Sequence, residues 1–75
     1  MTNATISRNR RRAEYMDALD EVLTTWKLAE AGSADGRARW PAALGALKSA
    51  HEAWHGAGGN PNPIVLARWT ARPMP

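Results

Sequence analysis

The chain contains no cysteine and no phenylalanine, and its 75 residues include a single tyrosine. Without cysteine, no disulfide can stabilise the fold and no thiolate can bind a metal. A chain this short also buries a smaller share of its surface than a larger domain does. Much of its apolar content is alanine, which favours helix but adds little buried area. We therefore expect one small helical domain over 1–75, with a thin core that a partner chain helps to complete.

Long apolar runs are missing as well. No run approaches the roughly 20 residues of a membrane helix. The basic N-terminus is not followed by the apolar region of a secretory signal. We expect no membrane association, no secretion through a recognisable signal, and a place in the cytoplasm or inside a larger assembly. The chain also has no glycine-rich phosphate loop, no nucleophile motif and no paired catalytic acids, so we expect no enzyme.

The pattern of apolar residues predicts an all-α fold, a two-helix antiparallel hairpin with a short third helix or an extended C-terminal tail. After a loose N-terminus over 1–7, the first helix is expected over 8–31 and ends at Gly32, a glycine suited to the left-handed conformation after a helix. Its acidic residues are expected on the solvated side, where they could pair with a copy of the chain or with a basic partner. Its apolar stripe consists of Tyr15, Met16, Leu19, Val22, Leu23 and Trp26.

The second helix is expected over 41–56. Residues 33–39 are predicted to be a linker with a turn at Asp35 and Gly36, and Pro41 suits the first helical position. Gly45 lies off the apolar face and costs helix stability; either the helix tolerates this cost, or a neighbouring backbone approaches closely at this position. Glycines at 56, 58 and 59 end the helix. The apolar face consists of Trp40, Ala43, Leu44, Leu47, Ala50, His51 and Trp54.

The last segment, 63–71, follows Asn62 and Pro63, which together are a helix start signal. The β-branched residues Ile64 and Val65 leave an extended tail as the alternative. This segment must cover the hairpin or dock on another protein. Trp69 is a candidate interface anchor, because tryptophan dominates interface hot spots. The predicted protein interface comprises Ile64, Val65, Leu66, Arg68, Trp69 and Arg72.

Four arginines precede the first acidic residue of the chain, Glu14. One interpretation is a phosphate-binding arm for nucleic acid, and the other is a solvated first turn of the first helix. Positive charge at a helix N-terminus opposes the helix dipole, which favours an interaction role over a stabilising one. The candidate residues for a nucleic acid or another anionic partner are Arg8, Arg10, Arg11 and Arg12.

The residues His51, Glu52 and His55 form the pattern H-E-x-x-H within the second helix. It resembles the motif of zinc proteases, in which two histidines one turn apart bind zinc and the glutamate acts as general base. The longer form of that motif requires a histidine where Pro61 stands. Because no Asp, Glu or His follows His55, a third ligand must come from an earlier segment or from another chain.

A second metal interpretation uses Glu52 and His55 as the Glu-x-x-His of a di-iron site, with Glu21 or Asp20 as partner in a dimer of hairpins. That arrangement resembles two-helix ferritin-like proteins. The simpler alternative needs no metal at all: His51 packs in the hairpin facing Tyr15, and His55 is a histidine near a helix C-terminus, where the dipole favours it. The cofactor prediction is therefore none, with zinc or iron as the alternative.

These observations predict a small non-enzymatic interaction or assembly module that binds another protein or copies of itself. Such a module could be a subunit of a larger complex, a phage-type structural or accessory protein, or an inhibitor that masks a partner surface. The alternatives are a nucleic-acid-binding regulator that uses the arginine cluster and a metal-binding protein that uses the histidine motif.

Overall fold

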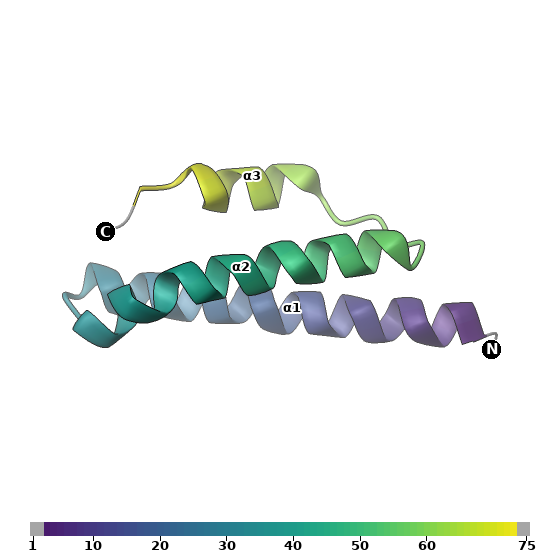
Figure 1. The fold of residues 1–75 in the computed structure, drawn as a ribbon, viewed down its shortest axis with the longest axis horizontal. Helices are drawn as coiled ribbons and strands as arrows, with labels where there is room; N and C mark the ends of the chain where they lie inside the picture. Colours follow the sequence, from purple (N-terminus) through teal and green to yellow (C-terminus); the bar gives the residue numbers. More distant parts are fainter. Residues whose placement is uncertain (1–2, 74–75) are drawn as a thin grey trace.

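The computed structural model describes residues 3–73, and these residues form three helices and no strand, as the predicted all-α fold requires. Helix α1 spans Asn3–Glu30, α2 spans Ala34–Gly56 and α3 spans Pro63–Ala71. Helices α1 and α2 form the antiparallel hairpin, and α3 runs back along α2 (Figure 1). The short-helix alternative for residues 63–71 is therefore confirmed. The molecule is elongated, with principal dimensions of 46 × 19 × 13 Å.

Helix α1 begins earlier than the sequence indicates. The loose N-terminus expected over 1–7 is helical from Asn3 onward, while Met1 and Thr2 lie outside the described residues. Residues 3–7 contain neither glycine nor proline, so a helix that has formed over the following residues can extend into them at little cost. At its other end Gly32 has a φ of +91°, and the amide of Ser33 donates to the carbonyl of Leu28. This bonding pattern is a Schellman motif, which ends the helix as expected.

Helix α2 also begins earlier than predicted, and the linker expected over 33–39 is wrong. The hydroxyl of Ser33 caps the helix by accepting a hydrogen bond from the amide of Gly36 at 3.1 Å. Pro41 therefore lies inside α2 and does not open it. Because Pro41 has no amide hydrogen, the carbonyl of Arg37 lacks its usual donor. Both residues are exposed, so water can donate to that carbonyl instead.

The core lies between α1 and α2. Its buried residues are Tyr15, Val22, Trp40, Ala43 and Leu47, and these come from the two predicted apolar faces. The core is thin, as expected from the alanine content. Thr25 is also fully buried on α1, where its hydroxyl donates to the carbonyls of Glu21 and Val22.

Helix α3 is positioned by the segment that precedes it. A second Schellman motif ends α2, with Gly58 at a φ of +93° and the amide of Gly59 donating to the carbonyl of Trp54. Asn62 then caps α3 by accepting from the amide of Ile64 at 2.9 Å, with Pro63 in the first turn. The chain thereby turns back, and Leu66 and Trp69 pack against the core from the side of α2.

Candidate functional site

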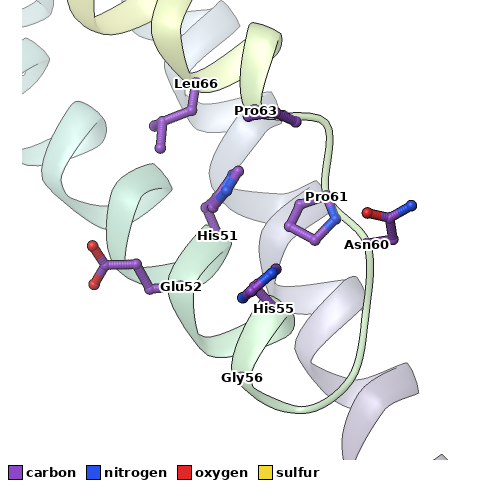
Figure 2. A pocket seen from close by; sticks show the side chains of 8 residues that line it. All are labelled: His51, Glu52, His55, Gly56, Asn60, Pro61, Pro63 and Leu66. Atoms are coloured by element: carbon purple, nitrogen blue, oxygen red, sulfur yellow. The ribbon is translucent and has the colours of Figure 1, made fainter.

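An open pocket of about 540 Å³ lies between the C-terminal part of α2, the loop after it and the start of α3 (Figure 2). His51 and His55 lie one helical turn apart on the wall that α2 provides, and both rings are directed toward the loop and α3. Leu66 and Pro61 form apolar parts of the lining. The complete lining consists of His51, Glu52, His55, Gly56, Asn60, Pro61, Pro63 and Leu66.

His51 packs against Tyr15 as the antiparallel hairpin predicts, with 6.1 Å between the ring centroids in an edge-on arrangement. Tyr15 also contacts Trp54, at 5.1 Å. Burial of Tyr15 raises the pKa of its hydroxyl, because the charged form would lose its solvation. The Nδ1 atom of His51 is buried and has no hydrogen-bond partner among residues 3–73. His51 is therefore a packed histidine with an unsatisfied Nδ1 atom.

Glu52 lines the rim of the same pocket, but its carboxylate is directed away from the two imidazole rings (Figure 2). Within residues 3–73, no three His, Asp or Glu side chains are arranged to hold a metal ion. The zinc-type set of His51, Glu52 and His55 is thus not assembled. The di-iron set stays a prediction, because it needs Glu21 or Asp20 in a dimer of hairpins and the structure describes a single chain.

Glu21 has a different role in this chain. Its carboxylate accepts a hydrogen bond from Arg39, which also donates to Asp35 at 3.3 Å. Both contacts raise the pKa of Arg39, and the hydrogen bond to Glu21 has the larger effect. The acidic face of α1 is therefore partly paired with the early turns of α2.

The arginine cluster lies within α1, and two of its members share one carboxylate. Arg10 and Arg11 both form ion pairs with Glu14, at 3.4 Å and 3.0 Å. Arg8 and Arg12 are exposed, and neither forms an ion pair within the described part of the chain. The cluster keeps a net positive charge on the N-terminal part of the helix.

The predicted interface residues divide into two groups. Trp69 has its aromatic partners within this chain, 5.9 Å from both Trp26 and Trp40. The guanidinium of Arg72 lies over the rings of Trp26 and Trp69, at 4.8 Å and 4.3 Å from their centroids. Leu66 also packs against the core, and Val65 is half-buried. Ile64 and Arg68 are exposed and remain available to a partner.

The sequence interpretation missed a division of the apolar residues of α1. Residues 15, 18, 22, 25 and 29 face α2 and are buried or half-buried. A second set, Met16, Leu19, Leu23 and Trp26, is displaced by one residue, and we call it the outer stripe. Met16 is 51% exposed and Leu23 is 40% exposed. The alternating spacing of three and four residues in both sets was the signal that could have separated them.

Comparison with known proteins adds no assignment, since no family model, curated protein or solved structure matches the chain. None of the helices described has both the length and the apolar character needed to cross a bilayer.

Proposed function

We propose that this chain is a non-enzymatic interaction module that binds another protein or a second copy of itself through the outer stripe of α1. The observation that carries the proposal is the exposure of Met16 and Leu23 on one line of the helix. Single exposed apolar residues are common on protein surfaces and need no explanation. These two are seven residues apart and continue an apolar line through Leu19 and Trp26, which favours a helix-packing face.

The rest of the chain leaves room for such a partner. Helix α3 covers the Trp26 end of the outer stripe through Trp69, but α3 packs on α2 and does not cover Met16 or Leu23. Burying both side chains in an interface would add a favourable term of about 25 cal/mol per Å² of apolar surface. A partner helix would thereby extend the thin core of the hairpin.

Charges at the two ends of the outer stripe support a second copy as the partner. Arg12 lies one turn before Met16, and Glu30 lies one turn after Trp26. In an antiparallel pair of α1 helices, Arg12 of each copy would lie near Glu30 of the other. Opposite charges at both ends of an interface favour that orientation over the parallel one.

The test is the oligomeric state of the purified chain by native mass spectrometry and sedimentation. We expect association that the double variant Met16→Lys, Leu23→Lys abolishes while its helical circular dichroism stays unchanged. The matched control is Asp17→Lys, Thr24→Lys, because both residues are exposed on α1 and neither lies three or four residues from a member of the outer stripe. A wild-type chain that stays monomeric and carries no co-purifying protein would contradict the proposal. Equal association of both double variants would contradict it too.

The second candidate function is binding of nucleic acid by the N-terminal part of α1. Tyr15 lies beside His51, and α2 ends at Gly56, so α1 residues before about Arg10 extend beyond the end of α2 (Figure 1). A projecting helix that carries exposed arginines can approach a phosphate backbone without obstruction by the hairpin. Arg8 and Arg12 favour this candidate, because no acid of the described chain neutralises them.

Fluorescence anisotropy with a labelled duplex at several salt concentrations tests this candidate. Each phosphate contact contributes about 0.9 to the slope of log affinity against log salt, so Arg8→Ala with Arg12→Ala should lower the slope by about 1.8. The control is Arg37→Ala with Arg68→Ala, since both of these arginines are exposed elsewhere on the molecule. Absent or salt-insensitive binding would exclude the candidate.

A further inference from the structure

We propose that His51 and His55 bind a divalent transition metal ion, such as Zn²⁺ or Cu²⁺, in the pocket at the end of α2, and that Glu52 turns inward to become a third ligand. The two histidines are the only ones in the chain, and there is no cysteine. They lie one turn apart on a single helix with both rings on the pocket side (Figure 2). That spacing allows two imidazoles to reach one ion.

The ring of His51 is packed against Tyr15, and its Nδ1 atom is enclosed by protein. Buried polar atoms in native proteins nearly always have a hydrogen-bond partner, and an exception calls for an explanation. The Nδ1 atom of His51 has none among residues 3–73. Because Nδ1 is enclosed, Nε2 is the ring nitrogen left to face an ion in the pocket, and the contact with Tyr15 holds the ring in place.

Glu52 can complete the set because nothing holds it where it is. Its side chain is exposed and has no hydrogen bond or ion pair within the described residues. It precedes His55 by three residues, which makes the two side chains neighbours on the helix surface. A change of rotamer is therefore sufficient to bring the carboxylate toward an ion held by His55. Two imidazoles and one carboxylate are a known ligand set for zinc, with the fourth position left to water.

The electrostatic surroundings of the pocket contain both signs. The C-terminal end of α2 carries the negative end of the helix dipole, which favours a cation beside its last turn. By the helix register, His55 lies level with about Arg11 of α1, whose charge opposes the cation. Arg11 is paired with Glu14 at 3.0 Å, and the same carboxylate also pairs with Arg10. The local repulsion is thereby reduced.

The three side chains are not assembled without metal. The movement of Glu52 therefore reduces the net free energy of metal binding. Each ligand should therefore contribute separately to the affinity. Loss of an outer-shell partner of a metal ligand already costs about 10- to 100-fold in affinity, so removing a directly bound imidazole should weaken binding by at least about 100-fold, and replacing the carboxylate with an amide by at least about 10-fold. The ion would also link two positions of one helical turn, so the melting temperature should rise with metal concentration.

The experiment is calorimetric titration of the full chain with zinc chloride after treatment with a chelator. We expect one zinc ion per chain, with affinity reduced at least about 100-fold in His55→Ala and at least about 10-fold in Glu52→Gln. His55 is exposed, so its substitution leaves the core intact. The control is Asp35→Asn, which removes an exposed carboxylate at the start of α2, at the far end of the hairpin, and should leave zinc affinity unchanged.

Electron paramagnetic resonance of the Cu²⁺-loaded chain gives a second measurement that does not depend on affinity. We expect hyperfine coupling to two imidazole nitrogens, reduced to one in His55→Ala. Absence of saturable zinc binding would overturn the proposal. Binding that persists unchanged in His55→Ala would also overturn it, because the ion would then be held by scattered carboxylates.

Discussion

Gly36 lies against the backbone of Ala29, where the start of α2 crosses the end of α1. A Cβ atom built on Gly36 would lie 2.7 Å from the backbone nitrogen of Ala29 and 2.7 Å from the Cβ of Leu28. Both distances are shorter than van der Waals contact, and a backbone atom cannot move aside as a flexible side chain can. The absence of a side chain at position 36 therefore sets how closely the two helices approach.

Alanine at position 36 should destabilise the fold by about 1–3 kcal/mol, because the added methyl group forces α2 away from α1. Gly45 provides the opposite case on the same helix, since a Cβ built there meets nothing within 4 Å. Gly45→Ala should raise the free energy of unfolding by about 0.5–1 kcal/mol through helix propensity alone. Urea unfolding of the two variants tests the pair. Equal effects at both positions would contradict the close approach at Gly36.

The start of α2 yields a second prediction. Because Pro41 lies inside the helix, Pro41→Ala should restore a backbone hydrogen bond and stabilise the fold by about 1–3 kcal/mol. A proline in the first helical position would give almost no change on the same substitution. Thermal unfolding followed by circular dichroism measures the difference.

Ser33→Ala is the companion variant for the same boundary. It removes the hydroxyl that accepts from the amide of Gly36, and this should cost about 1 kcal/mol. No loss of stability in this variant, together with no gain in Pro41→Ala, would place the helix start near residue 41.

The failed linker prediction shows which interactions decided the boundary. Trp40 followed by Pro41 is a local start signal, and Asp35 followed by Gly36 is a local turn signal. Both lost to the cap at Ser33 and to the packing of Gly36 against Ala29, a contact that forms only when α2 folds back on α1. Local patterns were sufficient where no such contact competes, as at Gly32 and Asn62.

Only one wall of the candidate pocket could be predicted from the sequence, for a similar reason. The position of His51 beside Tyr15 follows from two apolar faces that meet in an antiparallel hairpin. The opposite wall of the pocket depends on how the loop after Gly58 turns. The spacing of apolar residues along the sequence does not specify the path of that loop. The placement of Pro61 and Leu66 around the histidines therefore emerged only from the structure.

The packing of Trp69 yields a third prediction. Trp69→Ala should cost about 2–3 kcal/mol, somewhat less than a fully buried tryptophan, because Trp69 is half-buried between Trp26, Trp40 and Arg72. Arg72→Ala should cost about 0.5–1 kcal/mol through the lost cation–π contacts. The exposed Arg68 is the control, with an expected change within about 0.5 kcal/mol on substitution by alanine. If Trp69→Ala leaves unfolding unchanged, α3 does not pack as described.

The fourth prediction concerns alkaline pH. Tyr15 is 4% exposed, and burial raises its pKa above the usual value of about 10. Ionisation is therefore easier in the unfolded chain than in the folded one. The stability that Tyr15 provides is fully present below pH about 10 and is lost as pH rises through the pKa of the folded chain.

The single tyrosine makes this prediction testable without ambiguity, because the absorbance of tyrosinate reports on Tyr15 alone. The folded chain should ionise at higher pH than the chain in urea. As pH rises above about 10, the free energy of unfolding should fall more steeply in the wild type than in Tyr15→Phe. Lysine ionisation over the same range affects both proteins alike, so the difference between them isolates Tyr15. Parallel pH profiles would show that the hydroxyl is solvated in the folded chain.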